Sequence, residues 1–357
     1  MSRFLASARS KIKPYVPGEQ PRGQVFIKLN TNEAPYPPPP SVLEAVAASG
    51  SRLNLYSDPT GAELRAELAT YHGVAADNVS LGNGSDDSLA FIFMAFCDEN
   101  AGIVFPDVTY GLYPVLANLL NIPYTEIPLT ASLELNVVDY LNAGRTVIFA
   151  NPNAPTGIAM PLSDIERIAQ ANRDNVVVID EAYADFWGES AIGLTARHEN
   201  LLVVRTYSKS RFLAGARIAY MVGSRELIAD VEAIRNSLNP YNNGIPALAA
   251  GTAALRESDY YTARWAELID TRTWALDALR KRGFETTDSR ANFIFVRHDA
   301  IPSAELMMAL REHGILVRNL GPERIRDWLR ITIGMPEQMD ALTAAVDAIF
   351  REKGISK

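Results

Sequence analysis

The pattern that most constrains the fold is an alternation of short, almost continuous apolar runs with helical stretches. Helical periodicity lies between several of these runs, for example over residues 162–172. Strands that are apolar at every position are buried on both faces, as in a parallel sheet covered by helices. The sequence therefore predicts an α/β domain built on a largely parallel sheet. The apolar runs, each bounded by turn residues, are 102–105, 146–150, 176–179, 201–204 and 218–222.

A second and smaller α/β unit is expected after this sheet. A long amphipathic helix over about 258–282 leads into it, and three apolar runs between residues 293 and 333 then alternate with helical patterns. At 357 residues the chain is too long for one ordinary core. The predicted division is an N-terminal arm with part of the small domain at 1–45, a large domain at 46–257, and a linking helix with the C-terminal small domain at 258–357.

Charge and cysteine content narrow the classes of partner. The net charge of −8 argues against nucleic acid and against an anionic membrane surface. The single cysteine, Cys97, excludes an intramolecular disulfide and suits a reducing compartment. No apolar stretch has the length of a membrane span, the N-terminus lacks a signal-peptide core, and the four scattered histidines predict no metal site. We expect a cytoplasmic protein whose partners are small molecules.

One lysine stands alone in the long middle of the chain. Lys209 is the only lysine between Lys28 and Lys281, and arginine fills the other basic positions there. A lysine can lose its proton and attack a carbonyl, whereas arginine cannot. Lys209 follows a predicted strand and has a hydroxyl on each side, Ser208 and Ser210. This isolation at a strand end favours a chemical role over that of a solvated surface lysine.

An acid and a phenol follow the neighbouring predicted strand. Ligands of open parallel sheets gather beyond the carboxyl ends of the strands, where Asp180 and Tyr183 are expected. Asp180 could keep a pyridinium nitrogen protonated, since roughly 4 kcal/mol of attraction is available at about 4 Å with an effective dielectric near 20. Considered alone, Asp180 could also be a helix N-cap and Tyr183 a packing residue. An amine, a carboxylate and a phenol at adjacent strand ends are the groups that hold pyridoxal phosphate.

A phosphate site is predicted before another helix. Gly84, Ser85 and Asp86 precede the helical run 88–96, so their backbone can present amide groups to an anion. The three-glycine fingerprint of dinucleotide-binding folds is missing, which disfavours a Rossmann cofactor. The remaining contacts are expected from Arg217 and Ser208 at the phosphate and from Tyr110 stacked on the pyridine ring.

Together these clusters resemble the fold-type I pyridoxal-phosphate-dependent aminotransferases, and most closely the histidinol-phosphate aminotransferase family. The resemblance implies an aspartate-aminotransferase-like fold, in which the large domain binds pyridoxal 5′-phosphate. It extends over almost the whole chain, through Asn30-Thr-Asn-Glu-Ala-Pro-Tyr36, Leu55-Tyr-Ser-Asp-Pro59, Gly84-Ser-Asp-Asp87, Asn151-Pro-Asn-Ala-Pro-Thr-Gly157, Asp180-Glu-Ala-Tyr183, Ser208-Lys209 and Leu329-Arg-Ile-Thr-Ile-Gly334.

The resemblance also implies a role for each matching residue. Lys209 is expected to form the Schiff base with the cofactor and to carry a proton between the substrate Cα and the C4′ carbon. Asp180 is expected to pair with the pyridine nitrogen, and Tyr183 to donate to the cofactor oxygen. The phosphate set is Gly84, Ser85, Asp86, Ser208 and Arg217, with Tyr110 on the ring and Tyr56 reaching in from the neighbouring subunit of a homodimer.

One position departs from the family pattern. The family usually has an asparagine directly before Pro-Thr-Gly, and its amide donates to the cofactor oxygen, but this chain has Ala154. Loss of one donor to a charged acceptor costs roughly 1.5–3 kcal/mol. We expect Tyr183 to be the sole donor, and the cofactor imine to be more basic than in relatives, unless Asn153 supplies a second bond. Tyr207 and Arg211 also replace residues expected to be small or apolar, and the sequence offers no account of Arg211.

The substrate side is expected to bind different anions at one site. Histidinol phosphate carries a phosphate and glutamate two carboxylates, and arginine forks bind both groups. Arg330 matches the main anion-binding arginine of the family, and Arg318 and Tyr15 match accessory contacts. Asn32, Glu33 and the loop 241–243 are expected to line the pocket. The predicted reaction is transamination of L-histidinol phosphate with 2-oxoglutarate, in histidine biosynthesis. Alternatives are an aromatic or other amino-acid aminotransferase, a threonine-phosphate decarboxylase of the same fold, and a non-catalytic binding protein.

Overall fold

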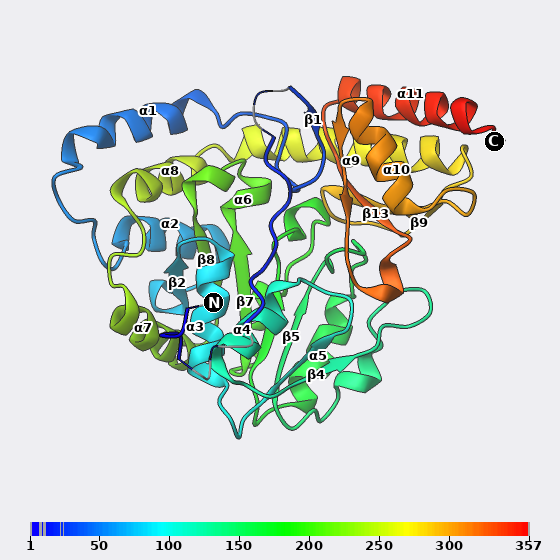
Figure 1. Cartoon of the computed structure of the whole chain (residues 1–357). Helices are drawn as coiled ribbons and strands as arrows, with labels where there is room; N and C mark the ends of the chain where they lie inside the picture. Colours follow the sequence, from blue (N-terminus) through cyan, green and yellow to red (C-terminus); the bar gives the residue numbers. More distant parts are fainter. Residues whose placement is uncertain (1, 7–8, 10–11, 22, 24, 356–357) are drawn as a thin grey trace.

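The large unit of the protein is built on a seven-stranded sheet, shown in the computed structural model of Figure 1, which describes residues 2–6, 9, 12–21, 23 and 25–355. Its strands are β2 (Val79–Gly82), β3 (Ile103–Pro106), β4 (Tyr124–Ile127), β5 (Thr146–Ala150), β6 (Val177–Asp180), β7 (Leu201–Thr206) and β8 (Ala219–Val222). They lie in the order β2-β8-β7-β6-β5-β3-β4. From β7 to β4 all neighbours are parallel, while β8 is antiparallel to both of its neighbours. The predicted, largely parallel sheet is confirmed.

Both faces of this sheet are buried, which explains why its strands are apolar at successive positions. In β5, Val147 and Phe149 join one hydrophobic cluster, whereas Ile148 between them joins the other. Alternate side chains of a strand point to opposite faces, so each cluster belongs to one side of the sheet. The helices that contribute to the cluster of Ile148 are α3 (Ser85–Phe96), α4 (Leu112–Leu120) and α7 (Arg225–Leu238). Those on the other side include α2 (Ala62–His72), α5 (Leu162–Ala171) and α8 (Ile245–Leu255).

A smaller unit contains a second sheet. Its strands, in the order β12-β13-β10-β9, are all antiparallel to their neighbours. They are β9 (Glu285–Thr286), β10 (Phe293–Arg297), β12 (Arg318–Asn319) and β13 (Leu329–Thr332), accompanied by α10 (Ser303–Glu312) and α11 (Pro336–Lys353). The long helix α9 (Ser258–Arg280) leads into this unit, as predicted for 258–282.

The N-terminal part of the chain joins the small unit. β1 (Ile27–Lys28) pairs in parallel with β11 (Ile315–Leu316), and α1 (Pro40–Ser49) follows. This pairing agrees with an N-terminal arm that contributes to the small domain, although the boundaries at 45/46 and 257/258 stay a prediction. Among the described helices, none has both the length and the apolar character that crossing a bilayer requires.

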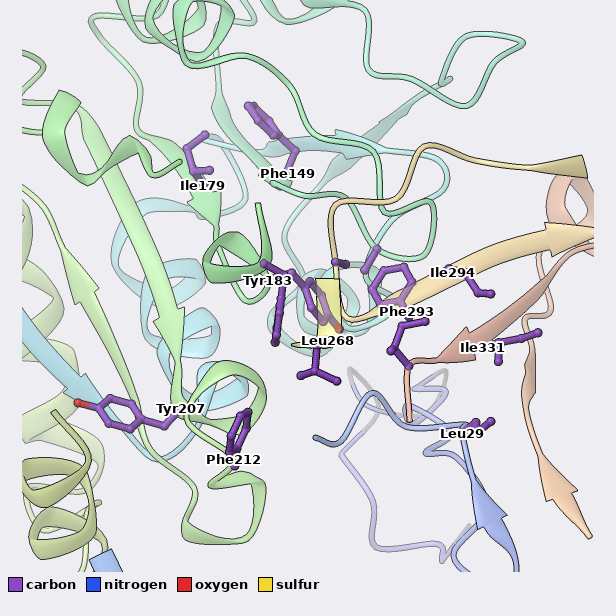
Figure 2. Close-up of a cluster of buried hydrophobic side chains, with 14 of the residues drawn as sticks. Leu29, Phe149, Ile179, Tyr183, Tyr207, Phe212, Leu268, Phe293, Ile294 and Ile331 are labelled. Atoms are coloured by element: carbon purple, nitrogen blue, oxygen red, sulfur yellow. The ribbon is translucent and has the colours of Figure 1, made fainter. Parts of the chain in front are cut away.

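One hydrophobic cluster extends from the large sheet into the small one. It contains Phe149 and Ile179 of the large sheet together with Phe293 and Ile331 of the small sheet, and Figure 2 shows Tyr183 between these two groups. The rings of Tyr183 and Phe293 meet edge to face, with centroids 5.0 Å apart. This packing fixes the Tyr183 side chain at the junction of the two units, where it can face a bound ligand.

Candidate active site

A cavity of about 380 Å³ lies beyond the carboxyl ends of β6 and β7, and the small unit supplies part of its wall. Ligands of parallel sheets are expected at this edge. The cavity collects residues from most of the length of the chain. The predicted site residues that line it are Tyr15, Asn32, Ser85, Asp86, Tyr110, Asp180, Tyr183, Ser208, Lys209, Arg217, Arg318 and Arg330.

Asp180 is a buried carboxylate at the end of β6, with 3% of its surface exposed. The Tyr113 hydroxyl donates to Oδ2 at 2.9 Å, and the backbone N–H of Ala182 donates to Oδ1 at 3.2 Å. Burial raises the pKa of Asp180 to about 6, although these two hydrogen bonds oppose the rise. Among the described residues no cationic side chain forms an ion pair with it. A ligand with a protonated ring nitrogen would supply the missing cation.

Lys209 lies in α6 (Tyr207–Ser210), a single turn that follows β7. Its Nζ donates to the backbone oxygen of Thr31 at 3.3 Å. Burial, together with the positive charge of Arg330, lowers the pKa of Lys209 to about 8. An amine with this pKa is partly neutral near physiological pH, so it can act as a nucleophile toward an aldehyde.

Tyr183 keeps its proton free for a ligand. The Asn32 side-chain amide donates to the Tyr183 hydroxyl oxygen at 2.9 Å, so that oxygen is already an acceptor. Burial raises the pKa of Tyr183, which keeps the hydroxyl protonated at neutral pH. Asn32 is itself held by Thr332 of β13, whose hydroxyl accepts from the Asn32 N–H at 2.9 Å and donates to Oδ1 at 3.1 Å. The small sheet thereby orients a donor of the large unit.

The start of α3 and Arg217 form an anion site. Gly84 has φ 80°, and a Cβ there would lie 2.3 Å from the Arg217 guanidinium, so only glycine permits this approach. Arg217 Nη2 lies 3.3 Å from Asp86 Oδ2. In the described part of the chain, no side chain caps the N-terminus of α3, whose first residue is Ser85. A cation beside uncapped helix amides fits a phosphate.

Two tyrosines form one wall of the cavity. The Tyr110 hydroxyl donates to Asp86 Oδ1 at 2.8 Å, which ties the ring to the anion site. Tyr15 meets the Tyr110 ring edge to face, with centroids 5.9 Å apart. With the amine, the uncompensated carboxylate and the anion site, the residues present fit pyridoxal phosphate.

The structure corrects the expectation for Asn153. Ala154 lines the cavity, but Asn153 does not. The Asn153 amide is fully buried and donates to the Val108 oxygen at 3.0 Å and to the Thr156 hydroxyl at 3.2 Å. Because its donors are used elsewhere, Asn153 does not replace the asparagine that is missing at position 154.

The two arginines of the small sheet, Arg318 and Arg330, differ in how far hydrogen bonds within the protein already occupy their guanidinium groups. Arg330 Nη2 donates to the Asn30 oxygen at 3.0 Å, and its Nε has no hydrogen-bond partner among the described residues. Arg318 instead donates to the backbone oxygens of Val16 and Pro17, at 2.8 and 3.1 Å. Arg330 therefore has donors available for a substrate, whereas those of Arg318 already hold the N-terminal segment.

Tyr56 is placed outside the cavity of its own chain. Its side chain is 81% exposed, and its ring stacks on Tyr241 with centroids 4.5 Å apart. A contact to the phosphate could come only from a second chain, so this role stays a prediction.

Sequence reasoning missed Tyr113, which holds Asp180. It lies three residues after Tyr110, and the two rings meet edge to face with centroids 5.8 Å apart, so a second tyrosine this close to the predicted ring-stacking residue is the signal that could have revealed it. Glu33, by contrast, is among the residues expected to line the pocket, and it does line the cavity, where it accepts a hydrogen bond from the Thr31 hydroxyl at 2.8 Å.

The fold and this cavity define a pyridoxal-phosphate-dependent enzyme of fold type I. An isolated amine and a buried carboxylate lie at adjacent strand ends, with an anion site at a helix start, as that cofactor requires. Residues 24–349 match the family "Aminotransferase class I and II". The chain belongs to this family, and within it to the histidinol-phosphate aminotransferases, so the predicted family and cofactor are confirmed.

Similar proteins cover nearly the whole chain. It is 44% identical to histidinol-phosphate aminotransferase 1 of Bradyrhizobium diazoefficiens, over 96% of this chain and 98% of the relative. It is 47% identical to histidinol-phosphate aminotransferase 2 of Thiobacillus denitrificans, over 98% of each. Histidinol-phosphate aminotransferase from Sinorhizobium meliloti, solved in complex with pyridoxal-5′-phosphate, superposes with a TM-score of 0.84 at 26% identity, over 92% of each chain. L-threonine-O-3-phosphate decarboxylase from Porphyromonas gingivalis has the same fold, with a TM-score of 0.79 at 20% identity, over 91% of this chain and 100% of that one.

Proposed function

We propose that the protein transfers the amino group of L-histidinol phosphate to 2-oxoglutarate, as a step of histidine biosynthesis in the cytoplasm. The observation that carries the proposal is the position of the Lys209 amine, which shares one cavity with Asp180 and Arg330. The relatives at 44% and 47% identity, matched over nearly their full length, support the choice of amino donor.

Each of the cavity residues has a separate role in the proposed transamination. Pyridoxal phosphate supplies an aldehyde that condenses with amines and a ring that withdraws electrons from the substrate carbon. Lys209 is the amine for the covalent link, and its pKa of about 8 also suits it to move the proton at the substrate Cα. When the cofactor is bound, the negative charge of Asp180 would hold a proton on the ring nitrogen, and Tyr183 would donate to the ring oxygen. Arg217 and the first amides of α3 would hold the phosphate.

The substrate anion is assigned to Arg330. Its partly free guanidinium faces the same cavity as Lys209, and a planar fork can bind either a carboxylate or a phosphate through two hydrogen bonds. Tyr15 and Asn32 line the space between, while Arg318 holds the N-terminal segment over it. This arrangement accounts for an enzyme that accepts both glutamate and a phosphate ester.

We further propose a homodimer in which Tyr56 reaches the phosphate of the partner chain. The support is that six apolar or aromatic side chains on α1, in the following loop and at or just after the end of α7 are exposed, and that two of them, Tyr56 and Tyr241, stack on each other. Such groups on a soluble protein mark interaction surfaces. They are Leu43, Leu53, Leu55, Tyr56, Leu238 and Tyr241.

Two measurements test the function. Borohydride reduction of the holoenzyme followed by peptide mapping should place the label on Lys209, and a label elsewhere contradicts the assignment. Histidinol phosphate, phenylalanine and threonine phosphate are then compared as donors with 2-oxoglutarate. We expect glutamate to form fastest with histidinol phosphate. Faster turnover of phenylalanine would indicate an aromatic aminotransferase, and release of carbon dioxide without glutamate would indicate the decarboxylase.

A further inference from the structure

Arg211 is a buried cation enclosed by aromatic rings. Its side chain is 5% exposed, and its Cζ lies 5.1, 5.0 and 5.2 Å from the ring centroids of Tyr71, Tyr261 and Trp265. Its Nη1 has no hydrogen-bond partner among the described residues. Aromatic faces attract a cation, and a planar guanidinium can stack on several of them. The rings therefore compensate for part of the hydration that this charge has lost.

The caged arginine directly follows the helix that carries Lys209. That helix, α6, has four residues, and Arg211 is its C-cap. A helix of one turn contains few internal hydrogen bonds, so its position depends on side chains around it. At its start the Thr206 hydroxyl accepts from the Ser208 N–H at 3.1 Å, and at its end the Trp265 indole donates to the Ser210 oxygen at 2.7 Å. Trp265 thus holds both the last carbonyl of α6 and the next side chain.

Two of the three rings belong to the helix that leads into the small unit. Tyr261 and Trp265 are four residues apart on α9, which places them on one face of that helix. Further along α9, the buried Arg272 donates to the Ala291 oxygen at 2.8 Å, just before β10. β10 in turn pairs with β13, the strand of Arg330. A continuous set of contacts therefore joins the Lys209 turn to the strand that carries the anion-binding arginine.

Packing of the space between the three rings does not by itself explain why residue 211 carries a charge. An apolar side chain of similar volume is often as stabilising as a buried charged one, because it avoids the desolvation penalty. A guanidinium caged by three rings has instead a defined orientation, set by where the faces point.

We propose that Arg211 is a positioning residue, which fixes the Lys209 amine relative to Arg330 by tying α6 to α9. Arg211 does not line the cavity, so it acts through its neighbours. The inference rests on the proposed role of Lys209.

The test compares three variants of the holoenzyme. Arg211→Met removes the charge and keeps much of the length, and Arg211→Lys keeps the charge without the planar fork. Arg264→Met is the matched control, because Arg264, a residue of α9, also lies over aromatic rings, Tyr36 and Tyr260 at 5.0 and 5.6 Å, but is partly exposed. The readouts are the pH midpoint of the visible absorbance, which reports the surroundings of the bound cofactor, and kcat and KM.

For Arg211→Met we expect the midpoint to move by about 0.5 pH unit or more. We expect kcat to fall on the order of tenfold, with KM for the amino donor changed less than about threefold, because a displaced amine impairs the reaction more than binding. Arg211→Lys should recover part of both effects, and Arg264→Met should match the wild type.

An Arg211→Met protein with the wild-type midpoint and kcat overturns the proposal, even if it melts at a lower temperature. If Arg211→Met does not fold, Trp265→Phe replaces it, since phenylalanine keeps a ring and removes the hydrogen bond to Ser210. Trp265→Phe should shift the midpoint in a smaller measure, and an unchanged midpoint overturns the proposal. Borohydride labelling of the wild type separates the two hypotheses. A label away from Lys209 refutes the proposed function and this inference with it, whereas a label on Lys209 with an unaffected Arg211→Met refutes this inference alone.

Discussion

At the scale of single residues, the cavity contains a buried carboxylate, Asp180, that forms no ion pair with any described residue. Asp180 is buried and receives two neutral hydrogen bonds from the described part of the chain, so burial dominates and its pKa rises to about 6. A buried carboxylate without an ion-pair partner lowers the stability of the folded protein until a cationic ligand binds beside it. The same property that destabilises the protein without its cofactor therefore favours binding of a protonated ring.

This argument predicts the pH dependence of stability without cofactor. Because folding raises the pKa of Asp180 from 3.8 to about 6, the folded protein binds that proton more tightly than the unfolded chain. The stabilisation is complete below pH 4 and is lost as the pH rises through 6, by about 3 kcal/mol in total. Denaturant unfolding of the apoprotein at pH 4 to 7 measures it, with Asp180→Asn as the comparison. Equal pH dependence in the two proteins would contradict the account.

The alanine at position 154 makes a second prediction at this scale. Ala154 lines the cavity and Asn153 is turned away, so Tyr183 is the proposed sole side-chain donor to the cofactor oxygen. Ala154→Asn should add a donor worth roughly 1.5–3 kcal/mol and lower the pH midpoint of the visible absorbance by about one to two units. A midpoint that stays in place, in a variant shown to bind the cofactor, would mean that the added amide does not reach it.

At the scale of elements, the start of α3 requires a residue without a side chain at position 84. Gly84→Ala would place a Cβ against the Arg217 guanidinium and force alanine to φ 80°. We expect the cofactor to bind at least about tenfold more weakly, which corresponds to about 1.4 kcal/mol. Gly193→Ala is the control, because that glycine is exposed, has no positive φ, and no atom of the described residues lies within 4 Å of the position that a Cβ would take. Cofactor titration followed by absorbance compares them, and similar losses in both variants would disprove the effect.

The elements also show what a sequence can predict. Strands buried on both faces, such as β5, are almost entirely apolar, and this run predicts β5 at its observed bounds, Thr146–Ala150. The edge strand β4 is mostly exposed, so it has no apolar run and no signal in the sequence. A run of prolines does not by itself exclude a helix: Pro39 is extended, and Pro40 begins α1, because proline is well suited to the first turn of a helix.

The candidate site was likewise predictable only in part. Residues at strand ends, such as Lys209 and Asp180, could be predicted, because the topology of a parallel sheet brings those ends together. The direction of a side chain could not be, since it depends on which partner is nearby. Asn153 turns toward Val108, and Arg211 turns into a cage assembled from α2 and α9. Such contacts join residues that are far apart in the chain.

At the scale of the whole molecule, the cavity requires both units. The small sheet contributes Arg330 and holds Asn32, and the N-terminal segment lies across the cavity through Tyr15 and the bonds of Arg318. The chain nevertheless leaves Tyr56 outside its own cavity, with its exposed ring stacked on that of Tyr241. If a second chain covers this surface, each active site is assembled from two subunits.

Shared sites can be detected by mixing two inactive variants. Lys209→Ala lacks the amine and Tyr56→Ala lacks the proposed phosphate contact, so each homodimer should be impaired at both sites. After joint refolding at equal amounts, half of the dimers are mixed, and each mixed dimer contains one site with both residues intact. Activity should therefore recover to about a quarter of the wild-type value at equal protein, whereas sites confined to one chain would give only the average of the two variants. Recovery requires one site that combines Lys209 of one chain with Tyr56 of the other. It therefore tests the dimer and the position of Tyr56 together, independently of any change in stability.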